Sequence, residues 1–239
     1  MPRLDVLVTR SGLAESRERA QALILAGKVR VAGETVRRPD RSVSDDAAIA
    51  VDSDPGYASR GALKLAPALD RFGVDPRGLV CADIGASTGG FTDVLLRRGA
   101  VRVYAIDVGR GLLHWRLRQD PRVVVIERTN ARDIETLPEP VSLAVIDVSF
   151  ISLEKVLPAV RRAAPGADVV ALFKPQFEVG RSEVGKGGIV RDPSAVDAAL
   201  ARFREWCARS GYAVIAEAAS EIKGAEGNQE IFMHLRPAL

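Results

Sequence analysis

Short apolar runs alternate with amphipathic stretches over the last two thirds of the chain. The apolar runs are rich in β-branched residues and predict strands at residues 79–84, 101–106, 123–126, 141–146, 167–173, 212–218 and 230–235. Between them, apolar side chains recur at helical spacing over residues 92–98, 153–162 and 194–209. Near-continuous apolar strands are typical of a parallel sheet covered on both faces. The pattern therefore predicts a doubly wound, Rossmann-like α/β fold with seven strands, whose ligands bind beyond the carboxyl ends of the strands.

A different pattern precedes this body. Helical spacing of apolar residues begins at Leu4, and a second helix is expected from Ser16 to about Ala26, where Gly27 would end it. Alternating residues on either side of Gly33 indicate a short hairpin. From residue 51 the chain becomes polar and rich in turn residues. We expect a small α+β domain over residues 1–50, a linker over 51–59 and the α/β domain over 60–239.

Composition narrows the class of protein. The chain has 239 residues, 47% of them hydrophobic, which suffices for one sizeable core and a small second module. No apolar run approaches the ~20 residues that cross a bilayer, and the first residues do not resemble a signal peptide. Cys81 and Cys207 match no metal-binding spacing. The sequence predicts a cytoplasmic protein with neither a membrane nor a metal as partner.

Charge is distributed unevenly along the chain. Residues 1–41 hold nine Lys or Arg against five Asp or Glu, whereas the remaining residues hold 25 against 26. A basic N-terminal module on a near-neutral body suggests a polyanionic partner, although a solvated arginine-rich surface explains the composition equally well.

The first predicted strand of the α/β domain runs into a glycine-rich turn and then a helix. Gly85 would permit the tight turn, and Gly89 with Gly90 would let the backbone approach a ligand at the helix N-terminus. The turn has neither the spacing of dinucleotide binders nor the Gly-Lys-Ser/Thr of a triphosphate loop. The candidate cofactor-binding residues here are Asp83, Gly85, Ala86, Ser87, Thr88, Gly89, Gly90 and Phe91.

A second acid follows the next strand. Asp107, with Val108 after it, lies 22 residues past Gly85. A carboxylate at this point can accept both ribose hydroxyls of a cofactor that contains adenosine. The glycine-rich turn and this acid together favour such a cofactor more than either does alone.

Two further strands end in charged residues. Asp147 follows the strand at 141–146, and Lys174 follows the strand at 167–173, so both should face the crevice beside the cofactor. Desolvation after so apolar a strand favours the neutral amine of Lys174, which makes it a candidate general base for a hydroxyl. Lys64, on a short amphipathic stretch before the first strand, and Glu230, at the start of the last, complete a candidate catalytic cluster.

Several segments resemble one known family. Lys64, Asp147, Lys174 and Glu230 resemble the Lys-Asp-Lys-Glu tetrad of FtsJ-type ribose 2′-O-methyltransferases. Residues 59–65, 147–153, 174–178 and 227–230 are similar to signature segments of the TlyA family, and residues 3–50 resemble the S4 RNA-binding domain. TlyA proteins join these two domains, are often named haemolysins, and methylate cytidine 2′-hydroxyls of ribosomal RNA.

The resemblance implies roles for individual residues. The cofactor would be S-adenosylmethionine, with Asp83 near its methionine part and Asn130, Ala131 and Arg132 beside its adenine. Lys174 would deprotonate or polarise the hydroxyl, Asp147 would orient Lys174, and the other two tetrad residues would fix the ribose. A reversed last strand is also expected. Ribosomal RNA or ribosomal subunits would be the partner, and the candidate RNA-binding residues are Arg3, Arg17, Arg19, Lys28, Arg30, Ser59 and Arg60.

Three other functions were weighed. An enzyme that methylates a base nitrogen commonly carries Asn/Asp-Pro-Pro-Tyr/Phe after strand four, where this chain has Asp147-Val148-Ser149-Phe150. A membrane-lytic haemolysin would need an apolar-faced or spanning segment, and none is evident. An RNA-binding module with an inactive Rossmann domain conflicts with the presence of all four tetrad residues.

Overall fold

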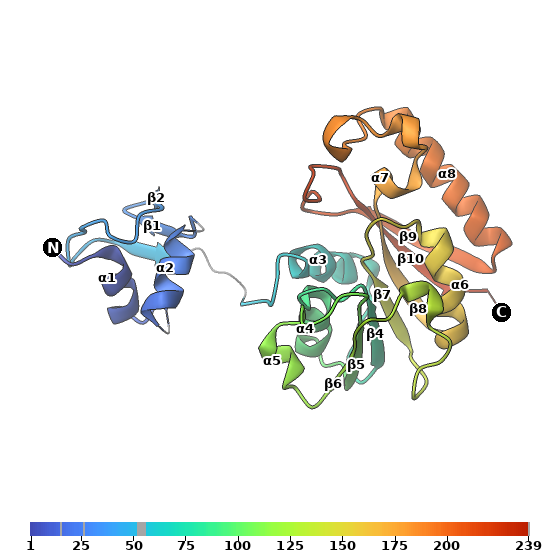
Figure 1. Ribbon diagram of the computed structural model, residues 1–239, viewed down its shortest axis with the longest axis horizontal. Coiled ribbons are helices and arrows are strands. Elements are labelled where there is room, and N and C mark those ends of the chain that lie inside the picture. The colour runs from blue at the N-terminus through green and yellow to red at the C-terminus, as the bar shows by residue number, and fades with distance from the viewer. Residues whose placement is uncertain (15, 26, 52–55, 239) are drawn as a thin grey trace. The chain divides into compact units, whose positions relative to one another are not determined.

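The computed structural model describes residues 1–14, 16–25, 27–51 and 56–238, and the side chain of Arg19 is not described (Figure 1). The chain divides into two compact units, Met1–Gly56 and Tyr57–Leu239. Of the expected linker, residues 52–55 lie outside the described part of the chain.

The N-terminal unit contains two helices and a small antiparallel sheet. The helices are α1 (Leu4–Arg10) and α2 (Arg17–Leu25), and the sheet has the order β2-β1-β3, with β1 Val29–Val31, β2 Glu34–Val36 and β3 Ile49–Val51. The predicted hairpin is confirmed, because Val31 pairs with Glu34 across a two-residue turn. The third strand was not predicted. Val51, which the sequence assigns to the linker, pairs instead with Val29.

A small core holds this unit together. Buried Leu4, Leu7 and Val8 from α1 pack with Ile24 from α2 and Val29 from β1. Each strand has only three residues, so the strands cannot bury a continuous apolar face by themselves. The two helices supply much of the apolar surface that makes the sheet stable.

The C-terminal unit is built on a seven-stranded sheet with the order β6-β5-β4-β7-β8-β10-β9. The strands are β4 (Val80–Ile84), β5 (Arg102–Ile106), β6 (Val123–Ile126), β7 (Leu143–Ile146), β8 (Asp168–Phe173), β9 (Tyr212–Ala219) and β10 (Ile231–Pro237). Strands β4 to β8 pair in parallel, and β10 is antiparallel to both β8 and β9. The predicted Rossmann-like α/β fold and its reversed last strand are confirmed.

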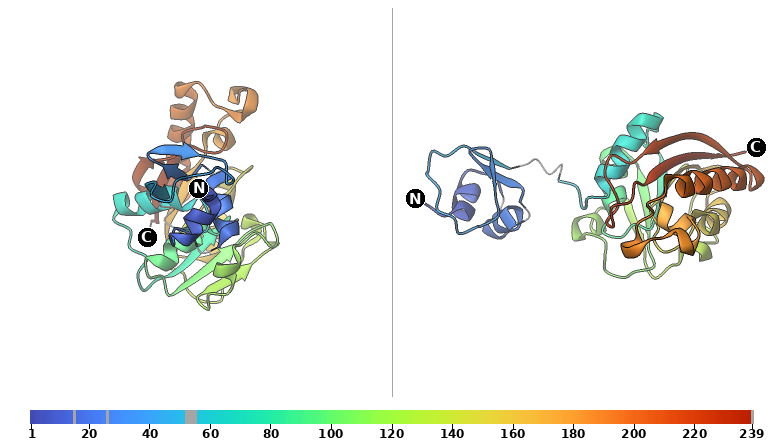
Figure 2. Two further views of the ribbon diagram at one scale, coloured as in Figure 1. Left: turned by 90° about the vertical axis from the view of Figure 1, so that its left-hand side faces the viewer. Right: turned by 90° about the horizontal axis from the view of Figure 1, so that it is seen from above.

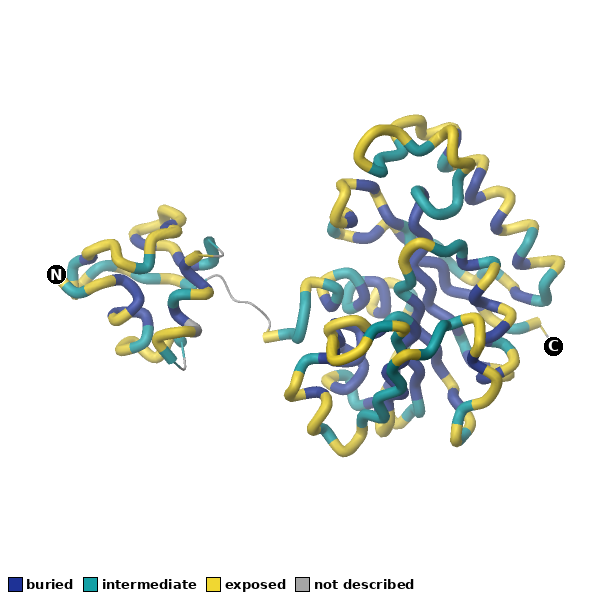
Figure 3. The backbone as a smooth tube through the Cα atoms, in the orientation of Figure 1, coloured by how far each residue is buried: buried dark blue, intermediate teal, exposed yellow. Residues whose placement is uncertain are grey.

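Helices cover both faces of this sheet (Figures 1 and 2). On one face, α3 (Ala62–Phe72) and α4 (Gly90–Arg97) contribute to one buried apolar cluster. On the other, α6 (Leu153–Ala163) and α8 (Pro193–Arg209) contribute to a second. The central strands are buried throughout, whereas the outer sides of the helices are exposed (Figure 3). The apolar strand sequences follow from this double cover.

The remaining helical segments are short. They comprise α5 (Trp115–Arg118), α7 (Pro175–Glu178) and three 3-10 turns at Ala131–Asp133, Arg181–Glu183 and Lys186–Gly188. Trp115 is 67% exposed and its ring stacks on His114. His234 is buried, with Nε2 3.0 Å from Asp168 Oδ2.

No helix within the described ranges is long and apolar enough to cross a membrane.

Candidate active site

The glycine-rich turn lies where three strands end. Gly85 has φ of +86°, and a Cβ there would lie 2.5 Å from the backbone oxygen of Asp147. The N–H groups of Gly85 and Ala86 both donate to the carbonyl oxygen of Ile106. Only glycine fits this position, because it combines a positive φ with close contact to the segment after β7. The turn is thereby fixed against the ends of β5 and β7.

Gly89 and Gly90 have a packing role that the sequence did not suggest. A Cβ on Gly90 would collide with Ser59 Oγ and lie 2.9 Å from the amide nitrogen of Ala62. A Cβ on Gly89 would collide with the side chain of Leu117. The neighbours of both glycines are thus protein atoms, and the glycines let α3 and α5 pack against the start of α4.

Asp107 is held by the glycine-rich turn and by its own loop. Its Oδ2 accepts a hydrogen bond of 2.7 Å from the amide of Ser87, and its Oδ1 accepts one of 2.7 Å from the amide of Gly109. The carboxylate lines a cavity of about 810 Å³, here called the first cavity. Each oxygen retains lone-pair capacity, so a diol can still bind to it.

The other predicted cofactor residues are distributed over two cavities. Gly85, Ser87, Val108, Asn130, Ala131 and Arg132 also line the first cavity. A second cavity of about 230 Å³ is lined by Gly85, Ala86, Ser87, Thr88, Gly90 and Phe91 from the same turn. Gly85, Ser87 and Asp147 line both cavities, so the two adjoin at the end of β7.

Asp83 lines neither cavity. Its side chain is fully buried and accepts a hydrogen bond of 2.6 Å from Thr92 Oγ1. Burial raises the pKa of Asp83 to about 7, and the hydrogen bond from Thr92 opposes that shift only in part. The observed contact links β4 to α4, whereas the methionine part of a cofactor was the partner expected from the resemblance.

The four candidate catalytic residues form two ion pairs. Lys174 Nζ lies 2.6 Å from Asp147 Oδ1 and donates to Ser149 Oγ at 3.0 Å. Lys64 Nζ lies 2.6 Å from Glu230 Oε2. Lys174 and Glu230 are buried. Buried charges are tolerated when each is paired with an opposite charge, as each of these is.

The sheet brings these four residues together. Lys174 directly follows β8 and Glu230 directly precedes β10, and the two strands pair with Phe173 opposite Ile231. Asp147 follows β7, which is the other neighbour of β8. Lys64 reaches the site from the first turn of α3. Residues separated by up to 166 positions along the chain therefore converge at one end of the sheet.

The second cavity has basic walls. Arg60, with Ser59, forms part of one wall, and Lys223, with Ile222, forms part of another. Lys64, which also lines it, is already paired with Glu230. Lys223 was not identified from the sequence, where its segment was interpreted only as a connection between strands. A Cβ on Gly224 would lie 2.5 Å from Glu230 Oε1, so that segment packs closely on the tetrad.

An exposed aromatic ring at the first cavity was also missed. Phe150 lines the cavity with 90% of its surface exposed, and its φ is +64°. Its ring lies 5.3 Å from that of Phe177, which lines the same cavity. A positive φ in a bulky residue is uncommon and costs free energy. The only sequence signal was a phenylalanine in a loop beside a candidate catalytic acid.

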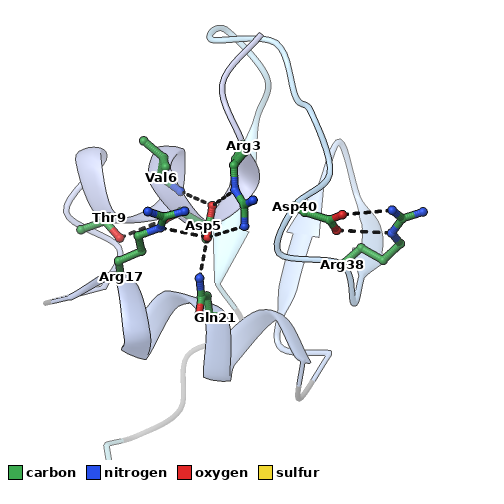
Figure 4. A network of polar contacts seen from close by, with 8 residues as sticks. All are labelled: Arg3, Asp5, Val6, Thr9, Arg17, Gln21, Arg38 and Asp40. Carbon is green, nitrogen blue, oxygen red and sulfur yellow. Dashed lines mark hydrogen bonds and ion pairs between the residues drawn. The ribbon is translucent and has the colours of Figure 1, made fainter.

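In the N-terminal unit, two candidate RNA-binding arginines contact a buried acid (Figure 4). Asp5 accepts hydrogen bonds from Arg3 and Arg17 at 3.0 Å each, from Gln21 at 2.7 Å and from the amide of Val6 at 3.0 Å. The Arg3 guanidinium, foremost among these donors, holds the pKa of Asp5 well below its usual range. Arg3 and Arg17 therefore stabilise this unit, while about half of each side chain remains exposed.

Two other candidate RNA-binding residues lie next to or on β1. Lys28 directly precedes the strand and is partly buried, and Arg30 is exposed on it.

Both units match known families. Residues 57–237 match the FtsJ-like methyltransferase family, and residues 2–49 match the S4 domain. A 16S/23S rRNA (cytidine-2′-O)-methyltransferase, TlyA, of Mycobacterium tuberculosis is 49% identical over 98% of this chain and 89% of its own length. Hemolysin A of Brachyspira hyodysenteriae is 43% identical over 97% of this chain and 98% of its own.

A solved structure is similar along nearly the whole chain. It is a Streptococcus thermophilus protein that carries a hemolysin name, with a TM-score of 0.78 and 42% identity over 99% of this chain and 88% of that one.

Proposed function

Because the chain belongs to the FtsJ-like methyltransferase family and carries an S4 domain at its N-terminus, we propose that it methylates a cytidine 2′-hydroxyl of ribosomal RNA with S-adenosylmethionine as the methyl donor. The observation that carries this proposal is the convergence of two Lys–acid pairs at one end of the sheet, where Asp147 lines both cavities and Lys64 lines the second. A ribosomal RNA substrate implies a cytoplasmic enzyme.

The first cavity fits an adenosine-containing cofactor. Asp107 presents a fixed carboxylate to the ribose diol, and Asn130, Ala131 and Arg132 provide a wall for the adenine. S-adenosylmethionine supplies an electrophilic methyl group when bound. The glycine-rich turn borders both cavities, which supports placing the methyl donor between the adenosine site and the tetrad.

The protein must then orient and activate the ribose hydroxyl. Lys174 accepts the hydroxyl proton when its amine is neutral, or polarises the oxygen when it is an ammonium, and Asp147 and Ser149 hold its nitrogen in place. Lys64 and Glu230 orient the sugar from the second cavity. Asp147 lines both cavities, so the ribose oxygen would meet the methyl group beside it.

Positive charge and an exposed ring support RNA as the substrate. Arg60 and Lys223 line the second cavity, where the phosphates next to the target ribose would lie. Phe150 offers its ring at the first cavity, where an unstacked base could stack on it. In the S4 domain, the exposed parts of Arg3 and Arg17, together with Lys28 and Arg30, would contact phosphates of folded RNA.

Transfer of a labelled methyl group to isolated ribosomal subunits tests this function. We expect the full chain to label ribosomal RNA in at least one subunit, and Asp107→Ala to raise the cofactor concentration needed for half-maximal labelling. If RNA in neither subunit is labelled, the assignment of ribosomal RNA as the substrate is wrong. If Asp107→Ala leaves the cofactor dependence unchanged, the assignment of the first cavity to adenosine is wrong.

A further inference from the structure

Glu178 belongs to the short helix α7, which begins directly after Lys174, yet its contacts lie on another element. Its Oε1 accepts a hydrogen bond of 2.8 Å from the amide of Leu153, and its Oε2 accepts one of 2.7 Å from Ser152 Oγ. These two residues begin helix α6. The carboxylate thus ties the segment after β8 to the end of the loop after β7.

This loop, residues 147–152, is attached to that segment at both of its ends. At its start, Lys174 pairs with Asp147 and donates to Ser149. At its end, Glu178 holds Ser152. Phe150 lies between these attachments, with its positive φ, and packs on Phe177. Backbone strain of this kind persists only where the surrounding structure fixes the chain on both sides.

A simple capping role does not account for the arrangement. Ser152 already caps α6, because its Oγ accepts a hydrogen bond of 3.2 Å from the amide of Glu154. Burial raises the pKa of Glu178 to about 7. None of the ion pairs in the described part of the chain involves Glu178, so its ionised form is costly here. A residue kept at such a cost beside the site is a candidate for a functional role.

We propose that Glu178 is a positioning residue that holds the 147–152 loop in the shape that presents Phe150 to the target base. The inference rests on the proposed methylation of RNA. Glu178 fixes the loop through two hydrogen bonds, and the loop in turn sets the position of the Phe150 ring. Lys174 and Glu178 thereby make one short segment the support for both the catalytic amine and the base-binding ring.

Four variants test the proposal: Glu178→Ala, Glu178→Gln, Phe150→Ala and the double variant Glu178→Ala/Phe150→Ala. Loss of the carboxylate should lower kcat/KM for RNA about tenfold, mainly through KM, because a misplaced contact weakens productive binding. The loop also lines the first cavity, so cofactor affinity is measured separately and should change less than KM for RNA. Glu178→Gln should restore most of the activity, since its amide can accept from Leu153 and donate to Ser152.

The double variant separates this role from general stability. If Glu178 acts through Phe150, then Glu178→Ala should have no further effect on KM once the ring is gone. Glu183→Ala is the matched control, because Glu183 is exposed and accepts a hydrogen bond only from Gly180 within its own turn. Wild-type kinetics in Glu178→Ala with a lowered melting temperature, additive effects in the double variant, or an inactive Glu178→Gln would each overturn the proposal.

Hydrogen exchange provides a readout that needs no activity. Glu178→Ala should speed amide exchange in residues 148–153 while leaving exchange in the central strands unchanged. If the wild-type enzyme labels no RNA, the proposed function is refuted. Hydrogen exchange alone would then test whether Glu178 holds the loop. Unchanged exchange in 148–153 would refute the attachment itself.

Discussion

The two units of this chain each hold an acid beside cations, but they use it differently. Asp5 in the N-terminal unit is fully buried, accepts from four residues and holds two arginines in place (Figure 4). Asp147 in the C-terminal unit is partly exposed, pairs with Lys174 and lines two cavities. An acid whose oxygens are saturated by protein donors stabilises the fold. An acid paired with one lysine at a cavity remains available for chemistry.

The largest effect that follows from this comparison concerns Lys174. Lys174→Ala should reduce kcat by about 10²–10⁴-fold, because a positioned proton acceptor is lost. Steady-state methylation of ribosomal subunits measures this loss. Lys155→Ala is the matched control, since Lys155 is an exposed lysine that lines the first cavity from α6. Equal losses in the two variants would contradict the role of Lys174.

The next effect concerns Asp5. Asp5→Ala should destabilise the N-terminal unit by about 2–3 kcal/mol, because its donors lose a buried charged acceptor. The C-terminal unit and its cofactor affinity should be unaffected. Asp40→Ala is the control, since the Arg38–Asp40 pair is exposed and weakly stabilising (Figure 4). Chemical denaturation, monitored by hydrogen exchange in each unit, measures the free energy of unfolding of both variants. Equal destabilisation by the two substitutions would refute the claim that Asp5 stabilises the unit more than Asp40 does.

Stability should depend on pH in opposite directions in the two units. The pKa of Asp83 is raised from 3.8 to about 7, so its contribution is present below pH 3.8 and is lost as pH rises to about 7. The pKa of Asp5 is lowered, so its contribution is present above pH 3.8 and is lost as pH falls below that value. Asp83→Asn should flatten the stability loss of the C-terminal unit between about pH 4 and 7, as measured by thermal unfolding. An unchanged profile would show that Asp83 does not cause it.

The smallest expected effect concerns the basic surface of the S4 domain. Replacing Lys28 and Arg30 together by Ala should weaken RNA binding and reduce the slope of log affinity against log salt by about one to two. Arg209→Ala is the control, because Arg209 is exposed on α8 and lines neither cavity. A slope equal to that of the wild type would show that these two residues do not contact RNA phosphates.

Elements of the C-terminal unit were predictable because most of its strands are largely apolar. The observed bounds of β6 match the predicted ones, and those of β4 and β5 differ by one residue. The three-residue strand β3 was missed, since so short a segment carries no periodic signal. Asp147 and Lys174 were found because charges stand out after apolar strands.

Contacts between distant segments were not predictable in the same way. The need for glycine at Gly90 comes from Ser59 and Ala62, and no local pattern reveals them. Glu178 ends the short helix α7 and Lys223 lies in a loop, and only the fold places them beside the tetrad. The arginines at positions 3 and 17 were identified by charge, whereas their bond to Asp5 depends on how α1 and α2 pack.

The measurement that tests the central claim most directly is mass spectrometry of nucleosides from ribosomal subunits treated with the wild-type enzyme and with Lys174→Ala. The two Lys–acid pairs at the end of the sheet predict new 2′-O-methylcytidine with the wild type and little or none with the variant. A methyl group found on a base nitrogen, or equal 2′-O-methylcytidine from both proteins, would contradict the account.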